Sequence, residues 1–89
     1  MTLIVKRAGH KENFDSRKVY ASVYAACLNV HTHVGEAELV ADKVSKELTS
    51  WLEDQKEVAA HDIFRQVTAV LGKYNPDAAF MYETHRDVS

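Results

Sequence analysis

The sequence predicts an α+β fold, in which four helices form a bundle and a small two- or three-stranded β-sheet covers one end of it as a lid. Three segments carry apolar residues at spacings of three and four, which is typical of helices with one buried face. An Asn-Pro-Asp tripeptide marks the start of a fourth helix. Near the N-terminus, a glycine separates two short segments with strand character, which is typical of a β-hairpin.

The lid is expected to begin as a hairpin. Leu3–Val5 and Asn13–Phe14 are its predicted strands, and Gly9 lies in the turn because glycine adopts a positive φ at little cost. The run Glu57–Ala59 is too short for a helix between two others. It is predicted to add one edge strand to the hairpin.

The first two helices follow the hairpin. Asp15 is expected to cap the first helix, whose apolar stripe runs to the vicinity of Asn29. A loop containing His31 and His33 separates it from the second helix. That helix is predicted from the stripe Ala37–Trp51 and ends near Leu52.

The third helix is predicted from the apolar stripe between Ile63 and Tyr74, with Gly72 weakening its end. Asn75 is a good N-cap for the fourth helix, and Pro76 suits its first position, where a missing N–H costs nothing. Three neighbouring apolar residues of this helix, at positions 80–82, cannot all face one core. At least one of them is therefore expected to be exposed and to serve as an interface anchor.

The composition limits the possible functions. The 89 residues suit a single domain, 1–89, and the only cysteine, Cys27, excludes an internal disulfide or a cysteine-rich zinc site, which favours a cytoplasmic protein. No apolar run approaches the roughly 18 residues of a membrane span, so no membrane partner is expected.

Charge is distributed unevenly. Residues 1–18 carry a net charge of +3 and the remaining residues −5, so the overall −2 hides a basic N-terminal segment. An acidic chain with one basic segment predicts a localised anion site and no direct binding of nucleic acid.

The stretch Val5–Val19, with Lys6-Arg7, Glu12, Phe14-Asp15 and Lys18, closely resembles the opening of ATP-cone domains. The resemblance continues through Val58–Ile63 and the Asn-Pro-Asp-Ala-Ala ending, so it covers nearly the whole chain. It implies a bundle of helices capped by a small sheet. It also implies binding of ATP or dATP, as in ribonucleotide reductases and their transcriptional repressors, with Mg²⁺ as an accompanying ion.

The resemblance assigns a set of nucleotide-binding residues: Val5, Lys6, Arg7, Glu12, Phe14, Asp15, Lys18 and Val19. The cations would hold the polyphosphate, Glu12 would accept the adenine amino group, and the apolar residues would wall the base. The residues alone leave other interpretations open. Lys6 and Arg7 could be solvated charges on opposite faces of a strand, Asp15 a simple helix cap, and Phe14 plain core.

Three departures from the family pattern are visible. Ala8 stands where aspartate is usual, Ala59-Ala60 lacks the usual serine or threonine, and Phe64 replaces a histidine that some members place near the phosphates. They leave the predicted fold intact and bear on phosphate affinity and on the choice between ATP and dATP.

No catalytic or metal site is predicted. The sequence has no nucleophile with a base at motif spacing and no phosphate loop, and its histidines lack metal-ligand spacing. We expect an allosteric regulator, not an enzyme, that signals through a nucleotide-dependent homo-oligomer or a separate regulated enzyme. Two alternatives remain: a degenerate cone that serves only as a protein-interaction module, and a small nucleotide-hydrolysing enzyme.

Overall fold

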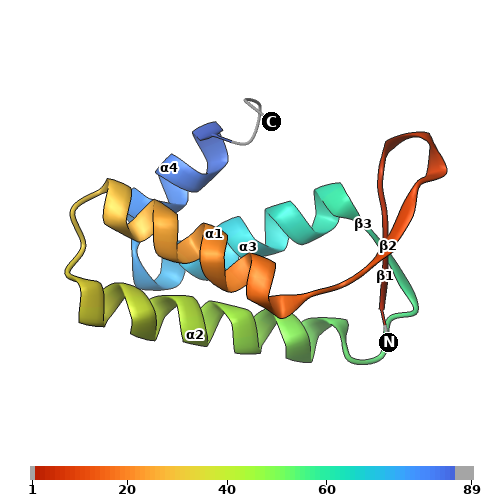
Figure 1. Ribbon diagram of the computed structural model, residues 1–89, viewed down its shortest axis with the longest axis horizontal. Coiled ribbons are helices and arrows are strands. Elements are labelled where there is room, and N and C mark those ends of the chain that lie inside the picture. Colours follow the sequence, from red (N-terminus) through yellow and green to blue (C-terminus); the bar gives the residue numbers. More distant parts are fainter. Residues whose placement is uncertain (1, 86–89) are drawn as a thin grey trace.

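The computed structural model describes residues 2–85, apart from the side chains of Arg7 and His85. It confirms the predicted α+β architecture, with four helices and a three-stranded sheet. The strands are β1 (Leu3–Val5), β2 (Lys11–Asn13) and β3 (Glu57–Ala59), and the helices are α1 (Ser16–Asn29), α2 (Val34–Leu52), α3 (Ala60–Tyr74) and α4 (Pro76–His85). The sheet lies at one end of the helical bundle (Figure 1).

The sheet has the order β2-β1-β3, so the predicted edge strand is present. β1 pairs antiparallel with β2 and parallel with β3. The second strand of the hairpin spans Lys11–Asn13, so the predicted strand Asn13–Phe14 was wrong at both ends and shares only Asn13 with it. In the turn, both Ala8 (φ 64°) and Gly9 (φ 76°) adopt the left-handed conformation, although only glycine does so without strain.

Helix α1 has defined signals at both ends. The Asp15 carboxylate accepts a hydrogen bond from the Arg17 backbone N–H at 3.0 Å, which confirms the predicted cap. At the other end, the His31 N–H donates to the Leu28 carbonyl and the Thr32 N–H to the Cys27 carbonyl. This is a Schellman motif, with His31 at φ 64° in the position usually taken by glycine.

Helix α2 begins three residues earlier than its apolar stripe suggested, because His33 acts as its cap. The His33 Nδ1 accepts a hydrogen bond from the Gly35 N–H at 3.2 Å. Its buried stripe includes Ala37, Val44 and Leu48, all with no exposed surface. This stripe packs mainly against α1, and the pair forms the largest helix contact of the bundle.

Helices α3 and α4 meet at Asn75. Its Oδ1 accepts a hydrogen bond from the Ala78 N–H at 3.1 Å, which confirms the predicted cap of α4. Its Nδ2 donates to the Thr32 hydroxyl at 2.9 Å, so the same side chain joins the α3–α4 corner to the α1–α2 loop. Asn75 therefore fixes the end of the bundle that is remote from the sheet.

Thr2 attaches the sheet to the bundle. Its buried hydroxyl lies 3.1 Å from the Leu52 carbonyl and 2.9 Å from the Gln55 carbonyl, at the end of α2. Its own carbonyl accepts a hydrogen bond from the Phe14 N–H. The start of β1 is thereby held against the bundle, and the hairpin extends away from it.

Candidate functional site

The register of the sheet determines which side chains face the bundle. Ile4 pairs with Glu12 on one side and with Val58 on the other, so these three side chains share a face. Val58 is only 6% exposed and belongs to the core. Glu12 is therefore directed toward the junction between the sheet and the helices.

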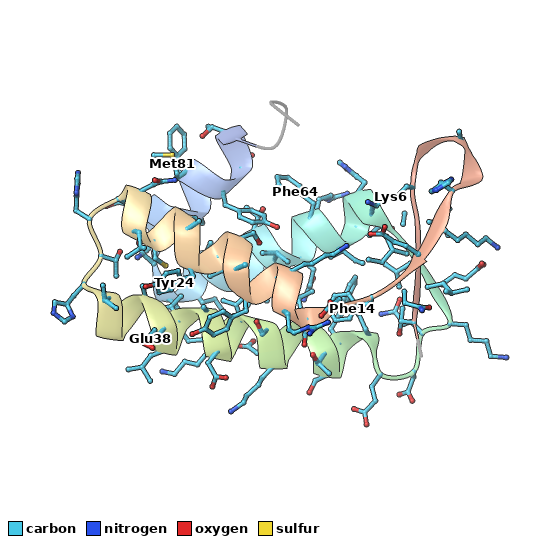
Figure 2. The ribbon with its side chains drawn as sticks, viewed as in Figure 1. Lys6, Phe14, Tyr24, Glu38, Phe64 and Met81 are labelled. Carbon is cyan, nitrogen blue, oxygen red and sulfur yellow. The ribbon has the colours of Figure 1, made fainter. Side chains whose placement is uncertain are left out.

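Two lysines meet Glu12 at this junction. The Lys6 Nζ lies 3.0 Å from Glu12 Oε1, and the Lys18 Nζ lies 3.7 Å from the same oxygen. Lys6 follows β1 and Lys18 lies in the first turn of α1, so one carboxylate connects lid and helix. Figure 2 shows Lys6 where the hairpin meets the helices. We call Lys6, Glu12 and Lys18 the junction triad.

The triad is electrostatically coupled. The hydrogen bond from Lys6 lowers the pKa of the Glu12 carboxyl, and the charges of Lys18 and Lys6 lower it further. One carboxylate faces two ammonium groups, so the triad has a formal net charge of +1. Lys18 is also unfavourably placed at the positive end of the α1 dipole. An anion is the group that such an arrangement accommodates best.

The apolar residues of the predicted site are not all at the junction. Phe14 is half-buried against the core, and Val19 is only 7% exposed within it. Val5 pairs with Lys11 and Ala59, so its side chain lies on the face of the sheet opposite to Glu12. The structure does not bring Val5 together with the triad.

Ile4, which was not among the predicted site residues, lies on the same face of the sheet as Glu12. It also packs against the core. The sequence alone does not say which of Ile4 and Val5 faces inward, and the pairing of Ile4 with Glu12 and Val58 decides it.

Two cationic positions differ from expectation. The strand ends at Val5, so Lys6 and Arg7 are not adjacent strand residues with alternating faces, and Arg7 begins the 3₁₀ turn Arg7–Gly9. The turn begins this early because two consecutive left-handed residues bend the chain sharply. The Arg7 side chain lies outside the described part of the structure.

Both carboxylate oxygens of Asp15 accept hydrogen bonds at the start of α1. Its two carboxylate oxygens accept hydrogen bonds from the Arg17 backbone N–H and from the Arg17 guanidinium, each at 3.0 Å. These bonds lower the pKa of the Asp15 carboxyl. A ligand contact by Asp15 would use the lone pairs that these bonds leave available.

An aromatic pair joins α3 and α4. Phe64 of α3 stacks on Tyr82 of α4, with ring centroids 5.3 Å apart and an interplanar angle of 16°. Phe64 is half-buried and lies on the side of α3 that faces α4 (Figure 2). The departure from histidine at this position thus places a ring contact between two helices.

Neither a metal site nor a membrane-spanning helix is found in the described part of the chain. Within residues 2–85, no group of three or more His, Cys, Asp or Glu side chains is arranged to hold a metal ion. His33 and His31 lie at the two ends of a helix-connecting loop, where each has the backbone role described above. In the same part of the chain, no helix has the length and apolar character that crossing a membrane requires.

Comparison with known proteins gives one finding. A family model described as the ATP cone domain matches residues 2–88, which is essentially the whole chain. A search of curated proteins found no match.

Proposed function

Since this chain belongs to the ATP-cone domain family, we propose that it is a nucleotide-sensing regulatory domain that binds ATP or dATP between the lid and the helices. The observation that carries this proposal is the junction triad. Lys6 and Lys18 come from different elements and meet at one point, where a polyphosphate could contact both. Arg7, which follows Lys6 directly, would be the third cation.

In this proposal, Glu12 has different partners in the free and loaded protein. Without ligand, its carboxylate pairs with the two lysines. The polyphosphate replaces the carboxylate as their partner, and exposed ion pairs of this kind are weak and easily broken. The released carboxylate then accepts a hydrogen bond from the adenine amino group. Guanine presents a carbonyl oxygen at the corresponding position, so the contact selects adenine.

Ile4 and Phe14 supply apolar surface for the base in this arrangement. Ile4 lies on the same sheet face as Glu12, and Phe14 packs at the start of α1. Val19 adds little exposed surface, since it is 7% exposed. Mg²⁺ would be bound through the phosphates of the ligand.

Calorimetric titration with ATP, dATP, ADP and GTP tests the proposal. We expect ATP or dATP to bind and GTP to bind much more weakly. Glu12→Gln should reduce this discrimination, because an amide offers a donor as well as an acceptor. It should also strengthen binding of inorganic tripolyphosphate, because both lysines lose their internal partner. Absence of binding by all four nucleotides would leave the alternative of an interaction module without nucleotide.

The output of the domain is proposed to be a change in association. Phe80 of α4 is 68% exposed, as expected for one of the three apolar residues at 80–82. The Phe64–Tyr82 stack connects α3 to the helix that carries Phe80. A nucleotide that alters the position of α3 relative to the lid can thereby shift the surface that a partner meets.

Sedimentation velocity without ligand, with ATP and with dATP tests this output. A homo-oligomer whose population depends on nucleotide is expected, and Phe80→Ser should shift it toward the monomer. Leu39→Ser is the matched control, since Leu39 is 57% exposed on α2 and distant from α4 in sequence. A monomer under all three conditions would leave a separate regulated enzyme as the partner.

A further inference from the structure

The sheet has an open edge at β3. The Leu3 N–H donates to the Lys56 carbonyl at 2.9 Å, so the backbone groups of Lys56 and, two residues on, Val58 are directed toward β1. The backbone N–H and carbonyl of Glu57 and the N–H of Ala59 are therefore directed away from β1. No strand lies beyond them in residues 2–85.

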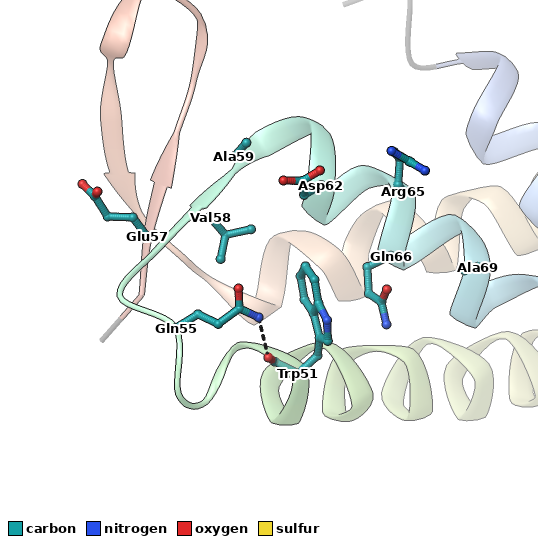
Figure 3. Close-up of a pocket in the computed structure, with 9 residues that line it drawn as sticks. All are labelled: Trp51, Gln55, Glu57, Val58, Ala59, Asp62, Arg65, Gln66 and Ala69. Carbon is teal, nitrogen blue, oxygen red and sulfur yellow. Dashed lines mark hydrogen bonds between the residues drawn. The ribbon is translucent and has the colours of Figure 1, made fainter.

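A hollow of about 410 Å³ adjoins this edge, between the end of α2 and the start of α3 (Figure 3). Val58 and the half-buried ring of Trp51 form its apolar wall. Asp62, Arg65 and Gln66 form its polar rim. Within the described residues, none of these three rim side chains has a hydrogen bond or an ion pair, so all are available to a ligand.

The hollow is separate from the junction triad. At about 3.6 residues per turn, Asp62, Arg65 and Gln66 lie on one side of α3, and Phe64 lies on the other. A ligand in the hollow would therefore leave Phe64 uncovered, and none of the three junction triad residues is among those that line the hollow.

We propose that the β3 edge and this hollow bind an extended, basic segment of a partner protein, which adds as a fourth strand to the sheet. Main-chain hydrogen bonds to Glu57 and Ala59 provide the pairing, and alternate side chains enter the hollow against Trp51. The surroundings select basic side chains, because residues 53–66 carry four carboxylates and only two cationic side chains, and among the described residues only one of the four, Glu57, has an ion pair, with Lys11. This inference does not depend on nucleotide binding.

A second copy of the chain is a poor occupant of the same edge. Two β3 strands paired about a two-fold axis would bring two sets of these carboxylates together. Like charges facing each other across an interface are unfavourable.

The test uses the whole chain without nucleotide and an acetylated, amidated heptapeptide of alternating lysine and valine. Trp51 is the only tryptophan, so its fluorescence reports on the hollow directly. We expect a saturable change in emission, confirmed by calorimetry. The matched control is the same peptide with proline at its two central valines, which removes two N–H donors. It should bind at least tenfold more weakly.

Two variants test the strand pairing itself. Ala59→Pro removes an outward N–H and fits the backbone, since Ala59 has a φ of −65°. The variant should bind the peptide at least tenfold more weakly, and its circular dichroism spectrum should be unchanged. Ala59→Ser keeps the N–H and should bind as the parent does. If Ala59→Pro fails to fold, the proline peptide still tests the proposal on the parent protein.

Two further variants test the charge preference. Asp62→Asn should bind the lysine–valine peptide more weakly, by about threefold or more. Glu38→Gln should have no effect, because Glu38 is an exposed carboxylate on α2, outside the hollow. Absence of saturable binding to the parent, or equal binding of the proline peptide, would overturn the proposal. Self-association that Ala59→Pro abolishes would also overturn it, in favour of a second copy.

Discussion

The helical bundle and the junction with the lid are held together in different ways. In the bundle, Val23, Leu48 and Leu71 have no exposed surface, and contact is mainly apolar. At the junction, exposed lysines meet one partly exposed carboxylate, and each strand is three residues long. A charged ligand can replace one partner of an exposed ion pair, whereas it cannot replace the contacts between buried apolar side chains. The contrast explains why the proposed nucleotide site lies at the junction.

The strongest test concerns the bundle. Leu48→Ala removes a fully buried side chain and should lower the free energy of unfolding by about 2–5 kcal/mol. Leu39→Ala, on the exposed side of the same helix, should change it by about 0.5 kcal/mol or less. Urea unfolding followed by circular dichroism measures both. Similar values for the two variants would mean that the bundle is not the rigid part of the molecule.

The second prediction concerns the junction and leaves the bundle unchanged. Lys6→Ala and Lys18→Ala should each weaken ATP binding by about 1.5–3 kcal/mol, the range for losing a hydrogen bond to a charged group. Neither should alter unfolding by urea noticeably, because both side chains are largely exposed. Lys46→Ala is a control for overall charge, since Lys46 pairs with Asp42 on α2. Unchanged ATP affinity in both junction variants would exclude these lysines as phosphate ligands.

The two regions also differ in how far the sequence predicts them. All four helices followed from apolar spacing and capping residues, because these signals are local, and the edge strand followed from a segment too short for a helix between two others. His33 as a cap was missed, since histidine is rarely used as one. At the junction, the resemblance supplied Lys6, Glu12 and Lys18. Their meeting at one oxygen depends on the register of β1 with β2 and on the position of α1, which no local pattern specifies.

Ile4 and Val5 show the same limit on a smaller scale. Both are apolar strand residues, and only the pairing with Glu12 and Val58 identifies Ile4 as the inward one. Because the side-chain period of a strand is two, an error of one residue reverses the face.

The third prediction concerns the hairpin turn. Ala8 has a φ of 64°, which costs an L-residue about 1–2 kcal/mol, and its side chain is exposed. Ala8→Asn should stabilise the turn by up to about 1 kcal/mol, because asparagine tolerates this conformation and loses no packing. Ala8→Gly should gain less, since glycine costs entropy on folding. Hydrogen exchange of the hairpin amides should slow in Ala8→Asn, while amides of the bundle exchange as before. Slowing in both regions would show that lid and bundle open as one unit.

The smallest effect concerns pH. Because Lys6 and Lys18 lower the pKa of the Glu12 carboxyl, the junction contacts are complete above its ordinary value near 4.5 and are lost as the pH falls through the lowered value. Carbon-13 NMR of the Glu12 carboxyl should therefore give a midpoint below 4.5. In Lys6→Ala, the midpoint should move back toward 4.5, since the hydrogen bond from Lys6 is the largest cause of the shift.

The bundle provides the control for that titration. Glu47 of α2 also titrates in the acid range, with its pKa lowered by the hydrogen bonds from Lys73 and Tyr74, so amides near it will move as well. The control is therefore an amide of the apolar core, such as that of Val23, which has no exposed surface and should keep its position while those of the hairpin move. A Glu12 midpoint at or above 4.5 would mean that the lysines do not hold the carboxylate in solution. The exchange of Glu12 for a polyphosphate would then have no basis, because the lysines would already be free in the unliganded protein.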